Sequence, residues 1–455
     1  MPIRKLDISH LDTSGAQYGA NLIYVASNAR FEWVLGTYVP ISLVPDWTST
    51  TESKITASDA QAFDQLGYSI SINSDATYVI VGARQEDGGS GDPVSDAGAA
   101  YVYVRSGSTW SQQQKLVASD AEASDYFGSS VSIGSDGTYA IVGAYNETSG
   151  AGAAYIFTRS GSTWTQQAKL TASDATANDN FGTSVSINSD GTYAIAGASY
   201  EDTGGTNAGA AYVFTRSGST WSQQAKIQSS DIQASDFFGQ SVSINSDGDY
   251  AIVGAWQEDT GGSNAGAAYI FTRSGSTWTQ QAKIQSSDAQ ASDFFGYSVS
   301  INSDATYAIV GAFGEDGGSG DPLSNAGAAY VFSRSGSTWT QQAKIVPDDL
   351  QAGDSVGNMA VAISGDGTTV IVGAAFEDGG AGDPLTSAGA AYVFTRSDST
   401  WTQQAKLTAS DAATNDRFGL SATINSDGSY AAVGAWLAHL GAVEDAGAAY
   451  IYEAG

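Results

Sequence analysis

The chain has 455 residues, no cysteine and a formal net charge of −30. The absence of cysteine excludes disulfides, thiol chemistry and cysteine-based metal sites. The negative charge argues against nucleic acid and anionic membranes as partners, because both require a positive patch. Cations and neutral polar ligands are the compatible partners, and we expect no membrane insertion, because no apolar run is long enough to span a bilayer.

The first 43 residues differ from the rest of the chain because they contain no repeat. Their start, MPIRKLDISHLDTSG, has basic residues but no apolar core behind them, so we expect no signal peptide. We predict two parts, an arm or anchor segment at residues 1–43 and one repeat domain at residues 44–455. The open alternative for residues 1–43 is a short β-arm that packs on the repeat domain.

A closely similar segment recurs seven times at spacings of 54 to 62 residues. The seven copies start at Lys54, Lys115, Lys169, Lys226, Lys283, Lys344 and Lys406. Each copy alternates short β-rich runs with Gly, Ser and Asp turns, as the four-stranded blade of a β-propeller does. The sequence therefore predicts an all-β, seven-bladed β-propeller of four-stranded antiparallel blades.

Within the third copy the pattern predicts four strands, at residues 181–187, 192–198, 208–215 and 220–227. The first run alternates apolar and small polar residues, as a half-buried strand does. The turn Asn188-Ser189-Asp190-Gly191 supplies a glycine that allows a tight hairpin into the second strand.

The last copy ends at Glu453, in its third strand, and has no fourth strand of its own. Residues 47–55 resemble the fourth strand at residues 221–227. We therefore predict that this N-terminal strand completes the seventh blade and covers an edge that would otherwise invite aggregation.

Acidic residues concentrate in two kinds of loop that lie on one face of a propeller. The loops between blades carry pairs five residues apart: Asp59 and Asp64, Asp120 and Asp125, Asp174 and Asp179, Asp231 and Asp236, Asp288 and Asp293, Asp349 and Asp354, and Asp411 and Asp416. For these pairs we favour capping of turns through the backbone over metal binding. On the opposite face we expect turn acids such as Asp75 to pair with hairpin arginines such as Arg105.

Three loops between second and third strands hold further acids in a Gly-rich context: Glu86, Asp87, Asp92 and Asp96 in the first blade, Glu315, Asp316 and Asp321 in the fifth, and Glu377, Asp378 and Asp383 in the sixth. Calcium takes six to eight oxygen ligands from carboxylates and carbonyls. These residues are therefore candidate calcium ligands, with turn capping and a solvated acidic surface as the alternative reading.

Phe127-Gly128 followed by Val142-Gly143-Ala144, repeated in the same order in each blade, resembles the FG-GAP repeat of integrin-like propellers, in its bacterial and phage variant. The resemblance covers residues 54–453 and implies the same fold. Integrin-type repeats hold calcium between the two motifs, whereas here only Asn188-Ser189-Asp190-Gly191 remains of that cluster. Separately, TSGAQYGANLIYVASNARFEWVLG within residues 1–43 resembles a segment that precedes receptor-binding or decorating domains in tailed-phage virion proteins.

The sequence offers little for catalysis. Its two histidines, His10 and His439, lie outside the blade pattern, so neither a Ser-His-Asp triad nor a histidine-based metal site has a basis, and we expect no enzyme. The residue after each Gly-Ala, by contrast, varies on a constant scaffold. It is aromatic at Tyr145, Trp256, Phe313 and Trp436, which we predict to bind a ligand, although such residues also seal neighbouring blades.

Two non-enzymatic hypotheses follow. In the first, residues 1–43 attach the chain to other virion proteins, as a tail appendage or capsid decoration, and the propeller contacts a host-surface glycan or protein. In the second, the chain is a stand-alone lectin-like adhesin that binds glycans between blades. Both hypotheses place it on a virion or outside the cell, and both allow a homo-oligomer.

Overall fold

The computed structural model describes residues 20–25, 30–35, 45–87, 94–316, 323–378 and 385–455. The chain divides into two compact units, Met1–Val44 and Pro45–Gly455. In the first unit, β1 (Ala20–Val25) pairs antiparallel with β2 (Arg30–Leu35). Within the described ranges, no helix has the length and apolar character needed to cross a membrane.

The second unit consists of seven four-stranded antiparallel sheets, which we number as blades 1 to 7 in chain order. The first strands are β4 (Leu66–Ile72), β8 (Ser130–Ile133), β12 (Phe181–Ile187), β16 (Phe238–Ile244), β20 (Phe295–Ile301), β24 (Val361–Ile363) and β28 (Phe418–Ile424). The second strands are β5 (Tyr78–Ala83), β9 (Tyr139–Ala144), β13 (Tyr193–Ala198), β17 (Tyr250–Ala255), β21 (Tyr307–Ala312), β25 (Thr369–Ala374) and β29 (Tyr430–Ala435). This arrangement confirms the predicted seven-bladed propeller.

The third strands are β6 (Ala99–Ser106), β10 (Ala153–Ser160), β14 (Ala210–Ser217), β18 (Ala267–Ser274), β22 (Ala328–Ser335), β26 (Ala390–Ser397) and β30 (Ala448–Ala454). The fourth strands are β7 (Thr109–Leu116), β11 (Thr163–Leu170), β15 (Thr220–Ile227), β19 (Thr277–Ile284), β23 (Thr338–Ile345), β27 (Thr400–Leu407) and, for blade 7, β3 (Thr50–Ile55). A short helical turn, α1 (Glu147–Gly150), lies between β9 and β10.

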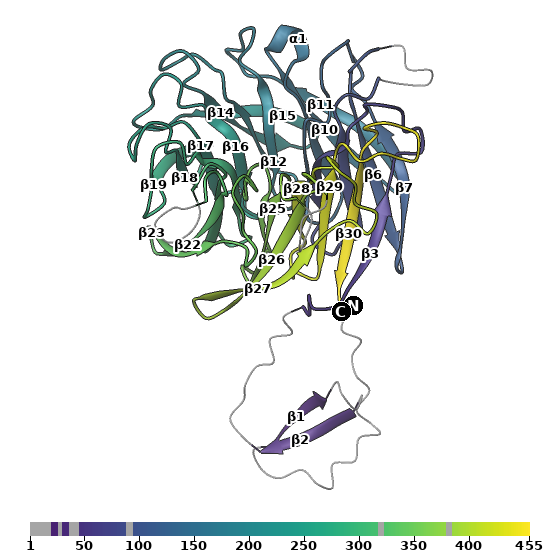
Figure 1. Ribbon diagram of the computed structural model, residues 1–455. Coiled ribbons are helices and arrows are strands. Elements are labelled where there is room, and N and C mark those ends of the chain that lie inside the picture. Colours follow the sequence, from purple (N-terminus) through teal and green to yellow (C-terminus); the bar gives the residue numbers. More distant parts are fainter. Residues whose placement is uncertain (1–19, 26–29, 36–44, 88–93, 317–322, 379–384) are drawn as a thin grey trace. The chain divides into compact units, whose positions relative to one another are not determined.

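The N-terminal strand closes the ring, as predicted. β3 pairs antiparallel with β30 from Thr50 opposite Ala454 to Ile55 opposite Ala449, and Figure 1 shows the purple β3 beside the yellow β30. Just before β3, Trp47 is 1% exposed and its Nε1 donates a hydrogen bond to the carbonyl of Gly428 at 3.1 Å. The first strand of the repeat domain is thus fixed to the last blade by a ladder and by a buried indole.

The repeated Phe-Gly and Gly-Ala motifs lie at the boundaries between blades. Gly128 has φ +92°, and a Cβ there would lie 2.2 Å from the carbonyl oxygen of Ala99 in the preceding blade. A Cβ on Gly82, in the Gly-Ala of blade 1, would lie 2.0 Å from the carbonyl oxygen of Gly128. The two motifs of adjacent blades therefore contact each other backbone to backbone, which only glycine permits.

A parallel bridge marks each of the seven boundaries, and the bridge between Leu66 and Gly447 joins blade 1 to blade 7. In blade 3, Gly209 takes part in such a bridge with Phe238 and has φ +86°. This explains why β14 begins at Ala210, two residues later than the sequence predicts. The hydrophobic core fills the space between blades: one cluster joins Ile80 and Val102 of blade 1 to Phe127 of blade 2.

The face formed by the tight hairpins, which we call the hairpin face, differs from the prediction. Arg105 Nε donates to the carbonyl of Ala76 at 2.6 Å, and the guanidinium lies 4.6 Å from the ring centre of Tyr430 in the preceding blade. Asp75 instead accepts the backbone N–H of Thr77 at 3.0 Å. The predicted Asp–Arg pairs are therefore wrong, and the short carboxylates of Asp75, Asp136, Asp190, Asp304 and Asp366 cap their own turns instead. The same Nε-to-carbonyl bond recurs at Arg159, Arg216, Arg273, Arg334 and Arg396.

Candidate functional site

The opposite face, which we call the loop face, carries a repeated ion-pair network. Lys115 Nζ lies 2.8 Å from Asp59 and also binds Glu86, while the hydroxyl of Tyr101 donates to Asp59 at 3.0 Å. Burial acts to raise the pKa of Asp59, but the hydrogen bonds from Lys115 and Tyr101 outweigh it and lower that pKa. The first aspartate of each predicted pair therefore binds a lysine of the blade that follows it.

This lysine–aspartate pair is present in every blade, as Lys115–Asp59, Lys169–Asp120, Lys226–Asp174, Lys283–Asp231, Lys344–Asp288, Lys406–Asp349 and Lys54–Asp411. In blades 1 to 6 the lysine also binds a buried glutamate. In blade 7, Ala438 takes the place of this glutamate. The correspondence is shown by the backbone: the carbonyl of Ala438 accepts the N–H of Gly447, just as the carbonyl of Glu86 accepts the N–H of Gly98 in blade 1.

The second aspartate of each pair has a different role. Asp64 is buried, and its carboxylate accepts the backbone N–H of Gln61 at 2.6 Å. The same cap is present in all seven blades, at Asp64, Asp125, Asp179, Asp236, Asp293, Asp354 and Asp416. Burial, assisted by the nearby charge of Glu86, raises the pKa of Asp64 to about 7. The predicted turn capping is thus confirmed for the second aspartates.

The candidate calcium ligands are mostly engaged within their own blades. Three of them, Glu86, Glu315 and Glu377, bind the lysines Lys115, Lys344 and Lys406. Asp87, Asp316 and Asp378 accept the backbone N–H groups of Asp96, Asn325 and Ser387, and Asp96 also accepts a hydrogen bond from Gln85. The remaining candidates Asp92, Asp321 and Asp383 lie outside the described residues.

Among the residues that the structure describes, no group of three or more His, Cys, Asp or Glu side chains could hold a metal ion. Calcium binding by these loops stays a prediction, because part of each loop is not described.

The predicted aromatic residues lie on the loop face and are half-buried. Trp256 sits at the boundary of blades 4 and 5, with its ring centre 5.3 Å from those of Phe294 and Tyr297 and 5.5 Å from that of Phe237. Phe313 stacks on Phe294, with centroids 4.9 Å apart and an interplanar angle of 15°. Two of the four predicted residues therefore belong to one aromatic cluster that spans blades 4 and 5.

The other two predicted residues belong to separate groups. Tyr145 stacks on Tyr126 at 5.5 Å, and Trp436 meets Tyr68 edge to face at 5.8 Å. Arg84, at the corresponding position of blade 1, lies 3.8 Å from the ring centre of Tyr68. The sequence-predicted set is thus distributed around a ring and does not form one cluster.

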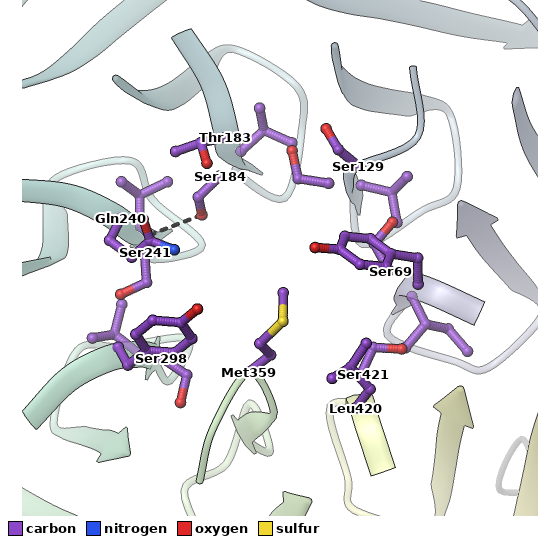
Figure 2. A pocket seen from close by; sticks show the side chains of 18 of the residues that line it. Ser69, Ser129, Thr183, Ser184, Gln240, Ser241, Ser298, Met359, Leu420 and Ser421 are labelled. Atoms are coloured by element: carbon purple, nitrogen blue, oxygen red, sulfur yellow. Dashed lines mark hydrogen bonds between the residues drawn. The ribbon is translucent and has the colours of Figure 1, made fainter. Parts of the chain in front are cut away.

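Among the four predicted residues, Tyr145 also lines the central channel. A cavity of about 230 Å³ is lined by the first strands of all seven blades, including Tyr68, Tyr297 and Gln240, and also by Tyr145. Figure 2 shows the labelled serines around an open centre, with Met359 directed toward the middle. Blade 6 has one residue more than the other blades between its Gly357 and Ile363, which places the 37% exposed Met359 there and leaves β24 short.

The cavity wall is held by bonds between blades. Ser69 donates to the carbonyl of Gly128 at 2.8 Å, and equivalent bonds join Ser130, Ser241, Ser298 and Ser421 to the next blade. These serine hydroxyls therefore join neighbouring blades, and the half-buried variable residues of the cavity wall, such as Tyr68, Gln240 and Tyr297, are the ones that remain for contact with a ligand.

Sequence reasoning missed two further variable positions, the residue before Phe-Gly and the residue after it, with Leu66-Gly67 and Val356-Gly357 in place of Phe-Gly in blades 1 and 6. The residue after this motif, or Met359 in blade 6, lines the channel cavity. Together with the residue after Gly-Ala these two positions form what we call the mouth residues: Gln65, Tyr68 and Arg84; Tyr126, Ser129 and Tyr145; Asn180, Thr183 and Ser199; Phe237, Gln240 and Trp256; Phe294, Tyr297 and Phe313; Ser355, Asn358, Met359 and Ala375; Arg417, Leu420 and Trp436. The signal was available, because these positions also vary between repeats.

The residue before Phe-Gly has a left-handed backbone conformation in every blade, with φ +56° at Tyr126, +53° at Phe237 and +57° at Phe294. Bulky residues rarely adopt this conformation, and such strain gathers at functional sites. Large side chains are thus held at this position in three blades at a cost in backbone energy.

Comparison with known families identifies seven consecutive FG-GAP repeat matches, at residues 49–103, 110–157, 164–214, 221–271, 278–332, 339–394 and 401–452. The chain belongs to the FG-GAP repeat family. No curated protein matches it. Each FG-GAP match runs from the fourth strand of one blade to the third strand of the next; residues 221–271, for example, contain most of β15 and all of β16 and β17. The first FG-GAP match begins just before β3, which is the fourth strand of blade 7. The sequence repeat is therefore offset by one strand from the structural blade, and this offset places the closing strand at the N-terminal end of the repeat domain.

Proposed function

We propose that this FG-GAP propeller is a non-enzymatic adhesion module whose mouth residues bind a host-surface glycan. The proposal depends on one observation: residues that differ between otherwise similar blades either line the channel cavity, as Tyr68 and Tyr297 do, or contact a residue that lines it, as Trp256 and Trp436 do. Ligand sites are concave and lined by apolar and aromatic side chains with a few polar groups. A sugar presents an apolar face for stacking and hydroxyls for hydrogen bonds, which suits this lining.

The tryptophans of the scaffold and of the mouth differ in their hydrogen bonds. Trp221 Nε1 donates to Gln167 at 2.9 Å, and Trp164, Trp278, Trp339 and Trp401 make the same bond to a glutamine of the preceding blade. In the described part of the chain, Trp256 and Trp436 have no acceptor for Nε1. A buried indole fixed for packing normally has such a partner. The two mouth tryptophans therefore do not follow the hydrogen-bonding pattern of the scaffold tryptophans.

The test is a glycan array probed with the intact protein and with Trp256→Ala and Trp436→Ala. Loss of an aromatic residue at the centre of an interface costs about 2 kcal/mol or more, so we expect binding to weaken by roughly thirtyfold. Phe63→Ala is the matched control, because Phe63 is a 52% exposed aromatic that is not a mouth residue. Glycan binding that survives both tryptophan substitutions would contradict the proposal.

We further propose that residues 1–43 attach the propeller to a virion, as a tail appendage or capsid decoration. This attachment is favoured by the resemblance of one segment within residues 1–43 to segments of virion proteins, namely TSGAQYGANLIYVASNARFEWVLG. Removal of residues 1–43 should then abolish association with the particle while glycan binding persists. If the particle retains the shortened protein, the stand-alone lectin-like adhesin becomes the better explanation.

A further inference from the structure

The basic residues of the propeller occupy mostly scaffold positions. Its seven lysines all bind carboxylates on the loop face. Six of its eight arginines donate to backbone carbonyls on the hairpin face. The other two, Arg84 and Arg417, are mouth residues at positions that are neutral in every other blade. The scaffold therefore does not account for these two charges.

Arg84 is held in place by neutral neighbours. Its Nε donates to Oε1 of Gln65 at 2.9 Å, and its guanidinium lies 3.8 Å from the ring centre of Tyr68 and 5.5 Å from that of Trp436. The ion pairs of the described residues involve the lysines and His439 but not this arginine. Because the ring covers only the face of the guanidinium, the Nη groups at its edge remain as hydrogen-bond donors.

Arg417, in blade 7, also lies over an aromatic ring. Its guanidinium lies 4.0 Å from the ring centre of Phe376, and within the described ranges its Nη1 is buried without a hydrogen-bond acceptor. Burial lowers the pKa of Arg417 and the nearby charge of Asp378 opposes this, yet among the described residues the two form no ion pair, and Asp378 accepts the backbone N–H of Ser387 instead. A buried cationic donor without a partner costs stability, so its presence at a variable position needs another reason.

A planar guanidinium that is stacked on an aromatic ring suits one kind of ligand group. It binds a carboxylate or sulfate through two parallel hydrogen bonds, while the adjacent rings can stack on the body of the ligand. The net charge of −30 disfavours a polyanion, whose charges would extend over the acidic loop face. A single anionic group is tolerated, because physiological salt screens exposed charges beyond about 8 Å.

From this geometry, and resting on the proposed glycan-binding function, we infer that the propeller mouth selects anionic saccharides, whose carboxylate or sulfate is bound by Arg84 and Arg417. This inference differs from the expectation based on the overall charge, which by itself favours cations and neutral ligands as partners.

The test measures affinities of the intact protein for an array of neutral, sialylated, uronic-acid-containing and sulfated oligosaccharides. We expect acidic sugars to bind about tenfold or more tightly than their neutral counterparts, since hydrogen bonds to charged groups have that strength. Arg84→Gln and Arg417→Gln should remove this preference, and Arg84→Lys should restore only part of it. Arg334→Gln on the hairpin face is the matched control, because it changes the net charge equally away from the mouth. Comparison of sialylated with sulfated sugars identifies the anionic group.

The outcomes separate this inference from the proposed function. Equal binding of neutral and acidic sugars would overturn the inference and leave the glycan-binding function standing. Absence of all sugar binding would overturn both. Binding of poly-glutamate in place of acidic sugars would also overturn it, because the partner would then be an acidic peptide. Melting curves establish whether each variant is folded. If Arg417→Gln does not fold, the affinities of Arg84→Gln alone decide the test.

Discussion

At the scale of single residues, the two aspartates of each loop between blades show how one residue type serves two purposes. Asp59 stays charged because it binds Lys115 and Tyr101, whereas Asp64 is buried against the backbone and resists ionisation. The sequence shows two identical residues five positions apart, and their spacing alone does not reveal which one faces the lysine. The difference arises from the lysine of the fourth strand, which reaches only the first aspartate.

These raised pKa values predict the pH dependence of stability. Burial raises the pKa of Asp64 to about 7 and those of Asp236, Asp293 and Asp354 to about 6, against about 3.9 in an unfolded chain. Between pH 4 and 7 the folded state thus binds more protons than the unfolded state, so the free energy of unfolding falls as pH rises through this window. We expect a lower melting temperature at pH 8 than at pH 5.

Aspartates with lowered pKa values, such as Asp59, act in the opposite direction but only as pH falls below about 4. Asp64→Asn should therefore stabilise the protein at pH 8 and have little effect at pH 5, as thermal melts would record. A melting temperature that rises from pH 5 to pH 8 and is unchanged by this substitution would refute the burial argument.

At the scale of elements, the period-2 pattern predicted the strands well where the backbone follows a regular ladder. β12 and β15 match their predicted ranges, whereas β14 starts later because of the bridge at Gly209. The predicted Asp–Arg pairs failed because the pattern shows which residues share a face but not which acceptors the arginines reach. The carbonyls of the adjacent turn are closer than the carboxylates.

Closure by β3 gives a prediction at this scale. Trp47→Ala removes a fully buried side chain beside the closing strand and should lower the free energy of unfolding by about 3–5 kcal/mol. Denaturant unfolding measures this loss. Trp110→Ala in β7 is the control, because Trp110 is only partly buried and should cost less. Equal losses for both variants would mean that the closing segment has no special role in stability.

At the scale of the whole molecule, the repeat number and the missing last strand were enough to predict a closed seven-bladed ring. The mouth was only partly predictable. The variation after Gly-Ala is visible in the sequence, but its contact with the positions on either side of Phe-Gly requires the folded blade, in which Arg84 lies over the ring of Tyr68 and Tyr68 lines the channel cavity. Three positions that are far apart in a repeat meet because every blade presents them at its inner end.

The central claim is that ligands bind at this mouth. Hydrogen–deuterium exchange of the intact protein, with and without millimolar sialyllactose and lactose, tests it most directly. Our account predicts slower exchange, with at least one of these sugars, in peptides that contain Gln65–Tyr68, Arg84, Phe237–Gln240, Trp256 and Phe294–Tyr297, and unchanged exchange at hairpins such as Arg105–Thr109. Protection confined to the hairpin face, or no protection by either sugar, would contradict it.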